Sequence, residues 1–364
     1  MRLHFYFARR FFKMFASVFA VFFLFMTLID LVEQMRRFGS YVSFGDVVYI
    51  TMLKTPQALY QILPLVMIIS TVSLFIALAR SSELVVARSV GRSALHTLIA
   101  PITVAFLIGL VTVSLFNPIV AATSVRYGEL SETYRSGSPS AFSIGREGLW
   151  LRQGGETGQT VIRAARANFD GSILFDVSML NYSKFGGPNR RIEADQASLR
   201  DGMWILERAK VWPLIPGINS EEAAQQHDIL RIESTLTREQ ITDQFGNPSS
   251  ISVWDLPKFI DQLDEAGFSA RRYAVWMQME LARPFFLVAM MLIGAAFTMK
   301  HSRFGATGLR VLSAILLGFG LYYVRNFAQI LGDNGQLPIL VAAWVPALAS
   351  IALALGLILQ MEDG

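Results

Sequence analysis

The apolar residues of this chain gather in six long stretches, separated by short polar segments and by one large polar region. The stretches cover residues 12–34, 57–79, 95–119, 277–299, 308–331 and 338–360. About 20 apolar residues cross the hydrocarbon core of a membrane as a helix, and lipid offers the backbone no other hydrogen-bond partner. The pattern predicts a membrane α-helical bundle of six transmembrane helices. The fourth and fifth are the least apolar, because Arg283 and Arg325 fall inside them or at their ends.

Residues 121–272, between the third and fourth spans, follow a different pattern. Short segments with partial alternation of apolar and polar positions are separated by turn-forming residues, and the pair Asp201–Gly202 is typical of a hairpin turn. This pattern predicts an inserted β-domain, in the form of a sandwich, a jelly roll or a barrel. The predicted strand segments are 148–152, 160–164, 173–182, 191–200 and 203–212.

Residues 252–267 predict a short amphipathic helix that leads into the fourth span and ends near Gly267. The predicted plan has three parts: transmembrane helices one to three (1–120), the β-domain (121–272) and helices four to six (273–364). The apolar side of the short helix would consist of Leu256, Phe259, Ile260 and Leu263.

Composition supports a membrane protein. The 364 residues are 53% hydrophobic and 16% charged, whereas ordinary soluble proteins carry about a quarter charged residues. The net charge of +4 is modest and gives no reason to expect nucleic acid as a partner. Cysteine is absent, which excludes disulfides and thiolate metal sites.

Lysine and arginine mark the cytoplasmic side of a membrane protein. They gather in the N-terminal tail, in residues 80–92 and in residues 300–310, whereas the link 332–338 has none. Arg36 and Arg37 at the end of the first span oppose this assignment, as does the acidic C-terminus. Three basic clusters outweigh these exceptions, so both termini are expected in the cytoplasm and the β-domain outside it.

Catalytic motifs are missing from the sequence. None of the six lysines follows a glycine, so the chain has no P-loop for nucleotide hydrolysis. The four histidines are scattered and form no HExxH motif, and the pair Glu221–Glu222 is more typical of solvated charge than of general acid–base chemistry. We therefore expect neither an enzyme nor a cofactor or metal in this chain.

Several charged residues lie inside the predicted spans, where they are costly and often functional. Two interpretations stand side by side. Local pairing between helix neighbours and snorkelling of arginines to the headgroups would make them structural. Alternatively, they form the rim of a cavity for an anionic, amphipathic substrate, since guanidinium groups suit phosphate oxygens. The residues are Asp30, Glu33, Arg36, Arg37, Glu280, Arg283 and Arg325.

The segment 80–93, "RSSELVVARSVGRS", interrupts two strongly apolar regions. Ser81 or Ser82 is suited to cap a helix start, Glu83 then lies in its first turn, and Gly91 supplies its end. A simple re-entry loop is the alternative. The preferred interpretation is a cytoplasmic docking helix over 81–91, whose charge meets a separate partner protein that drives the movement.

At these residues the chain resembles a known family, the YjgP/YjgQ (LptF/LptG) permeases of the lipopolysaccharide export ABC transporter. The resemblance also includes "LYQILPLVMIIS" entering the second span and "YAVWMQMELARPFFLVAMMLIGAAF" entering the fourth. The order of three spans, β-domain and three spans fits as well, so the likeness covers essentially the whole chain. "SELVVARSVG" and "LVEQMRRFG" are closer to the LptG branch than to the LptF branch.

The resemblance implies a transport mechanism in the bacterial inner membrane. A sister permease, LptF, would stand beside this chain, and a dimer of the ATPase LptB would bind ATP with Mg²⁺ below them. Lipopolysaccharide would enter between span one of one permease and span five of the other. It would then pass along the periplasmic β-jellyroll domain to a bridge of LptC and LptA.

The resemblance also implies roles for particular residues. Glu83 would be the acid of the coupling helix, with Arg80 and Arg88 beside it. Arg36 and Arg37 match the basic residues that meet the cargo, although Asp30 and Glu33 below them are able to neutralise them. Further candidates for substrate binding are Arg126, Arg135 and Arg325.

Two other classes of function compete with a transport permease. The first is a mechanical or scaffold membrane subunit of the lipoprotein-release or cell-division type, which passes on ATPase motion without moving cargo. Those proteins usually have four spans with the outer domain after the first, whereas here the domain follows the third. The second is an integral membrane enzyme, which the missing catalytic constellation disfavours.

Overall fold

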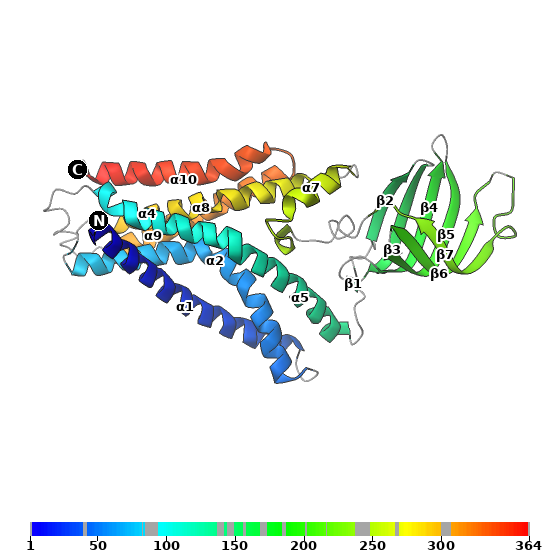
Figure 1. The fold of residues 1–364 in the computed structure, drawn as a ribbon, viewed down its shortest axis with the longest axis horizontal. Helices are drawn as coiled ribbons and strands as arrows, with labels where there is room; N and C mark the ends of the chain where they lie inside the picture. The colour runs from blue at the N-terminus through cyan, green and yellow to red at the C-terminus, as the bar shows by residue number, and fades with distance from the viewer. Residues whose placement is uncertain are drawn as a thin grey trace.

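A bundle of long helices fills one end of the molecule and an antiparallel sheet fills the other, as the computed structural model shows (Figure 1). Both termini lie at the end of the bundle that is farthest from the sheet (Figure 1). The structure describes residues 2–38, 42–81, 83, 94–136, 142–143, 149–155, 158–167, 173–183, 187–200, 202–215, 217–236, 248–265, 269–299 and 307–362.

Six helical segments of the described chain are long and apolar enough to cross a membrane, as predicted. They are longer than the predicted windows, because polar residues continue each helix beyond its apolar part. The predicted boundary at residue 120 falls within the third segment, which continues to Ser136. The segments are α1 (Arg2–Phe38), α2 (Phe44–Arg80), a continuous run of α4 (Ala94–Val111), the π-helix η2 (Thr112–Phe116) and α5 (Asn117–Ser136), then α8 (Arg271–Thr298), α9 (Thr307–Asp333) and α10 (Ile339–Glu362).

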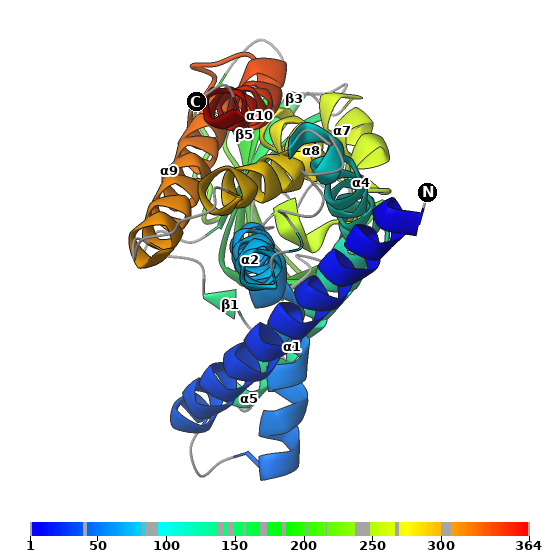
Figure 2. The ribbon, with the colours of Figure 1, turned by 90° about the vertical axis from the view of Figure 1, so that its left-hand side faces the viewer.

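Helix α8 is the centre of the bundle. It packs against α2, α4, α9 and α10, while α1 lies at the periphery against α2 and α4 (Figure 2). A Cβ atom on Gly109 of α4 would lie only 2.5 Å from the Cα atom of Pro284 in α8. In a membrane, where apolar side chains gain little by leaving lipid, close approach at small residues supplies much of the packing energy. Gly109 therefore allows α4 and α8 to touch backbone to backbone.

Proline interrupts four of the spans. It lies inside α2 (Pro56, Pro64), α4 (Pro101), α8 (Pro284) and α10 (Pro346). Helices α1 and α9, whose residues are all described, contain none. A proline inside a helix removes one backbone hydrogen bond and tends to kink the helix, so α1 and α9 are the two uninterrupted rods of the bundle.

The inserted domain is an antiparallel sheet whose strands β3 to β7 follow one another in space as they do in sequence. The predicted fold class, a six-helix bundle with an inserted β-domain, is thereby confirmed. All five predicted strands are present, and β1 and β7 are additional. The strands are β1 (Phe142–Ser143), β2 (Leu149–Gly155), β3 (Gly158–Ala167), β4 (Ile173–Ser183), β5 (Pro188–Arg200), β6 (Met203–Pro213) and β7 (Gln225–Glu233).

One face of the sheet carries its core, as strands with period-two alternation require. The largest buried side chain is Trp204, whose indole N–H donates to Oε1 of Gln153 at 3.3 Å. The predicted hairpin between β5 and β6 is present: Arg200 pairs with Met203, and Gly202 has a φ of 72°, which glycine adopts without strain. The core also includes Leu151, Ile162, Leu174, Val177, Met179, Ile192, Leu199 and Leu206.

The predicted amphipathic helix is α7 (Leu256–Glu265), which lies where the chain returns from the sheet to the membrane bundle. Leu256 and Phe259 are buried, and the Phe259 ring packs edge-on against Tyr273 of α8 with 4.8 Å between ring centres. A short 3-10 turn, η3 (Pro248–Ser250), precedes it. Together these elements attach the returning chain to the start of α8.

Candidate functional site

Glu83 lies just past the end of α2 and is held by side chains of α1. Arg10 forms an ion pair with it. The hydroxyl of Tyr6 donates to its Oε2 at 2.9 Å, and the hydroxyl of Ser81 donates to its Oε1 at 2.8 Å. The side chains of Arg10 and Glu83 are each 30% exposed. This cluster, which we call the Glu83 cluster, therefore links α1 to the end of α2 while leaving Glu83 accessible.

The pKa of Glu83 is lower than its ordinary value of 4.5. Burial alone would raise this pKa, but the hydrogen bonds from Arg10, Ser81 and Tyr6 outweigh that effect. An acid with a lowered pKa contributes stability above its unfolded pKa and loses it as the pH falls through the folded value. Glu83 is therefore an ionised carboxylate at neutral pH, and the stability that the Glu83 cluster contributes is lost in acid, as the pH falls through the lowered pKa.

The predicted docking helix 81–91 is described only at Ser81 and Glu83. Ser81 ends α2 rather than beginning a new helix, because its backbone N–H donates to the carbonyl of Ala77 at 3.0 Å and its hydroxyl donates there at 3.1 Å. Arg80, the last residue of α2, is exposed. The alternative cap Ser82, together with Arg88 and Gly91, lies outside the described residues. The docking helix therefore stays a prediction.

Two acids near the far end of α1 pair with a lysine of α2. Nζ of Lys54 lies 2.9 Å from Oδ1 of Asp30 and 3.2 Å from Oε2 of Glu33. Asp30 is buried and Glu33 is exposed. The sequence left open whether these acids neutralise Arg36 and Arg37. In the structure they pair with Lys54 instead.

Arg36 and Arg37 are exposed, and in the described part of the chain neither has a carboxylate partner. Arg37 donates to the hydroxyl of Tyr127 in α5 at 3.4 Å, and its guanidinium lies 5.7 Å from the ring centre of Phe38. Gln34 donates to the same hydroxyl at 3.3 Å. Two guanidinium groups therefore remain available to an anion at this end of α1. We call Arg36 and Arg37 the basic rim.

The other predicted substrate residues lie in different surroundings. Arg126 of α5 is exposed and pairs with Glu129 one turn later at 2.7 Å. The side chain of Arg135 lies outside the described residues. Arg325 of α9 is 7% exposed and faces α8, where it donates to the carbonyl of Met279 at 3.5 Å and lies 5.3 Å from the Phe286 ring centre. Arg126 is adjacent in sequence to Tyr127, which contacts Arg37 of the basic rim, whereas Arg325 is buried against α8 and does not belong to the rim.

A buried polar network crosses the bundle between α2, α5 and α8. Arg283 and Glu280 form a two-point ion pair at 2.6 and 3.0 Å, and they are 5% and 0% exposed. Tyr60 of α2 donates its hydroxyl to Glu280, and its ring lies 3.9 Å from the Arg283 guanidinium. Asn117 donates to the Tyr60 hydroxyl at 3.3 Å. Local pairing, one of the two interpretations from sequence, therefore holds for Glu280 and Arg283.

The π-helix η2 connects this network to the chain that returns from the sheet. Its wider turn alters the regular helix pattern, as π-helical turns often do at functional positions. The side-chain oxygen of Asn117 accepts from the backbone N–H of Val253 at 2.8 Å. The carbonyl of Ser114 accepts from the indole N–H of Trp254 at 3.0 Å. The polar network in the membrane is therefore bonded directly to the segment that precedes α7.

Comparison with known proteins decides the family. The sequence model described as "Lipopolysaccharide export system permease LptF/LptG" matches residues 5–360. This chain belongs to the LptF/LptG permease family. Two relatives are named lipopolysaccharide export system permease protein LptG. The one from Haemophilus influenzae is 24% identical, and the alignment covers 94% of this chain and 96% of the relative. The one from Escherichia coli K12 is 21% identical, with 92% and 91% covered.

Membership of the LptF/LptG family confirms the predicted resemblance, and the relatives' names agree with the expected likeness to the LptG branch. This LptF/LptG chain is a multi-pass membrane protein and a permease subunit of a lipopolysaccharide export system, in which a sister permease and further components take part. In its described part, no group of three His, Asp or Glu residues is placed to hold a metal ion.

Sequence reasoning did not single out four residues of these sites in the permease: Arg10, Lys54, Tyr60 and Asn117. Lys54 gave one usable signal, since it immediately precedes the charge-free stretch of α2 and so lies at the depth of the acids at the end of α1. Tyr60 and Asn117 gave none, because a tyrosine or an asparagine in a long helix is ordinary, and Arg10 is one of several basic residues in the N-terminal tail. Only the packing of the helices reveals these partners.

Proposed function

We propose that this permease subunit moves lipopolysaccharide out of the inner membrane in partnership with a sister permease, LptF. Hydrolysis of ATP by a dimer of the ATPase LptB would drive the movement, and LptC and LptA would receive the cargo in the periplasm. The observation that carries this proposal is the uneven burial of the spans. Only 11% of the apolar part of α1 and 22% of that of α9 are buried, compared with 83% for α8.

Helix α1 offers a continuous apolar face to a partner or to lipid. Its exposed side chains extend along the outer half of the helix and lead to the basic rim: Val21, Leu24, Phe25, Leu28 and Val32, which are 55–66% exposed. An amphipathic anion such as lipopolysaccharide matches this order, with acyl chains on the apolar face and phosphates at the guanidinium groups. The sister permease would supply the opposite wall with its own fifth span, as α9 would do for the first span of the sister.

Coupling to the ATPase would pass through Glu83. The carboxylate is ionised and accessible, so it is suited to meet a cationic side chain of the ATPase. Arg10 and Tyr6 attach Glu83 to α1, the same helix that carries the basic rim. A displacement of Glu83 by the motor would therefore be passed directly to α1, which is the wall of the proposed cavity.

The proposed orientation places the N- and C-termini and Glu83 in the cytoplasm and the sheet in the periplasm. Because the chain has no cysteine, a single introduced cysteine reports its own side of the membrane. In cells with a permeabilised outer membrane, an impermeant maleimide is expected to label Asp195→Cys on the sheet and to leave Glu83→Cys and Arg80→Cys unlabelled until the inner membrane is opened. Labelling of Glu83→Cys in intact inner membranes would contradict the orientation and, with it, the coupling role.

A photo-crosslinking amino acid at Phe25 or Arg36 is expected to capture lipopolysaccharide, and the yield should change when ATP is added. Both side chains are exposed on the proposed wall. Leu353 of α10, 42% exposed on another side of the bundle, is the matched control and should give little product. If neither α1 position captures cargo while positions in the sister permease do, α1 does not line the path. That result would favour the mechanical-subunit interpretation for this chain.

A further inference from the structure

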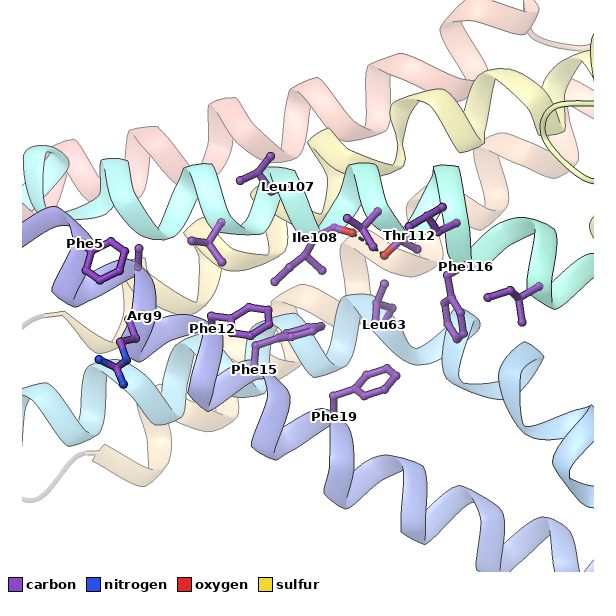
Figure 3. A pocket seen from close by; sticks show the side chains of 15 residues that line it. Phe5, Arg9, Phe12, Phe15, Phe19, Leu63, Leu107, Ile108, Thr112 and Phe116 are labelled. Carbon is purple, nitrogen blue, oxygen red and sulfur yellow. Dashed lines mark hydrogen bonds between the residues drawn. The ribbon is translucent and has the colours of Figure 1, made fainter.

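A groove of about 760 Å³ lies between α1 and the α4–η2 segment (Figure 3). Its residues on α1 belong to the N-terminal half of that helix, whereas the basic rim lies at the C-terminal end. Phe12, Phe15 and Phe19 form its α1 wall, and residues of α4 such as Ile108 and Val111 form the other. It opens to the side, since Leu107, Val111 and Leu115 are 53–63% exposed. Its volume is typical of sites for small ligands, which are about 300–1,000 Å³.

Among the described residues that line this groove, only Arg9 and Thr112 are polar. Arg9 is its single charged lining residue, is exposed, and has no carboxylate partner in the described chain. Thr112, which lines the groove on η2, already donates its hydroxyl to the carbonyl of Ile108 at 2.7 Å (Figure 3). The Thr112 hydroxyl is therefore not available to donate to a ligand, and the Arg9 guanidinium is the charged group that a ligand would meet.

On α1, the part of the groove that lies beyond Arg9 is about as long as one leaflet of a bilayer is thick. From Arg9 to Phe19 the helix rises about 15 Å at 1.5 Å per residue, which is half of a hydrocarbon core of about 30 Å. Arg9 lies near the N-terminal end of α1, so the mouth faces the leaflet at that end of the bundle and the apolar part ends near the membrane centre. A chain that starts at an anionic headgroup and ends in mid-membrane fits this geometry.

A protein helix fits the groove less well than an acyl chain does. Helices approach one another closely in membranes where glycine, alanine, serine or threonine lines the contact. On the α1 wall of the groove Ala8 is the only such residue, among four phenylalanines: Phe5, Phe12, Phe15 and Phe19. A thin, flexible alkyl chain can pass between these rings, whereas a helix with side chains is about 10–12 Å wide.

We propose that this groove binds an acyl chain of an anionic glycerophospholipid, with the lipid phosphate held at Arg9. The site differs from the proposed cargo path, which lies along the other half of α1 near the basic rim. The inference requires only that the helices span a membrane. It does not depend on the proposal that the protein moves lipopolysaccharide. A bound lipid would fill the space between α1 and α4 and so fix the angle of α1 in the bundle.

The test uses the full chain, purified with the subunits that accompany it, in nanodiscs. The probe is phosphatidylglycerol with a photoactivatable diazirine at the end of one acyl chain, and phosphatidylcholine with the same chain is the neutral counterpart. Crosslinks are expected on the groove residues of α4 and η2. Arg9→Gln should reduce the yield about fivefold, the effect of one basic residue near an anionic surface. Lys13→Gln, an exposed cation one turn later that does not line the groove, is the matched control.

A second variant blocks the groove itself. Leu107→Trp should abolish the crosslinks at Ile108 and Val111, whereas Leu110→Trp, on an exposed position of α4 outside the groove, should preserve them. Equal labelling by both lipids would overturn the role of Arg9 and the proposal with it. So would crosslinks at these positions to a protein subunit or to lipopolysaccharide in preference to phospholipid. Because the readout is lipid binding, a negative result leaves the transport proposal untouched.

Discussion

Glu83→Arg is expected to uncouple ATP hydrolysis from lipopolysaccharide export while the protein still inserts into the membrane. The substitution places a cation where the ATPase would present its own. Loss of one partner of a close interfacial charge pair costs about 2–5 kcal/mol, and about 1.4 kcal/mol is a factor of ten. Export by the reconstituted transporter should therefore fall about tenfold or more. ATPase stimulation by this subunit should fall with it.

The Glu83 cluster requires a second variant, because Glu83→Arg also breaks the ion pair with Arg10. The double exchange Arg10→Glu with Glu83→Arg restores an ion pair between the same positions but leaves a cation at position 83. If Glu83 docks to the ATPase, the double variant stays uncoupled. Recovery of export in the double variant would show that only the internal link to α1 matters. Wild-type ATPase stimulation and export in the single variant would contradict both roles.

Arg283→Ala is expected to destabilise the membrane bundle by about 3–5 kcal/mol, the usual effect of removing one partner of a buried ion pair. The reason is that Glu280, fully buried, would lose its two-point ion pair, and Tyr60 would lose the guanidinium that lies over its ring. The measurement is equilibrium unfolding of the purified subunit in mixed micelles, followed by its helical circular dichroism.

Two further variants test whether the lost stability comes from the buried ion pair. Arg126→Ala removes the exposed partner of Glu129, a kind of pair that contributes about 0–1 kcal/mol, so its unfolding should hardly change. The double variant Glu280→Gln with Arg283→Met removes both charges and keeps an acceptor for Tyr60. It should regain most of the lost stability, since a buried pair can be replaced by neutral residues at little cost. Equal unfolding of Arg283→Ala and Arg126→Ala would contradict the structural role of the network.

The membrane spans and most strands could be predicted from sequence, because each has a signal that depends on local pattern alone. Apolar length identified the six helices, and alternation identified β2 to β6. Strand β7 gave little alternation because it lies at the edge of the sheet, where none of its side chains is buried. The pair Glu280–Arg283 was also readable, since residues three apart share one helix face.

The partners across the bundle could not be predicted. Tyr60 and Glu280 are 220 positions apart in the chain, and α2 is apolar almost all round. Such a helix does not show which side faces a given neighbour, so the rotation of α2 that brings Tyr60 to Glu280 and Lys54 to Asp30 has no signature in the sequence. In the sequence Arg10 is only one member of a basic tail. Its ion pair with Glu83 could not be predicted, because the pair depends on how α1 crosses the end of α2.

Backbone continuity has a mechanical consequence for α1 and α9. An internal proline leaves a carbonyl one turn earlier without its donor, and in hydrocarbon that oxygen depends on fixed neighbours for a substitute. In α2 the carbonyl of Tyr60, which Pro64 leaves without its helical donor, accepts from Arg283 of α8 at 3.3 Å. Helices α1 and α9 have no internal proline and need no such neighbour. Helix α1 or α9 can therefore slide or tilt as a rigid unit without exposing an unpaired backbone carbonyl to lipid. The two least buried spans, α1 and α9, are thus also the spans that can be displaced most easily.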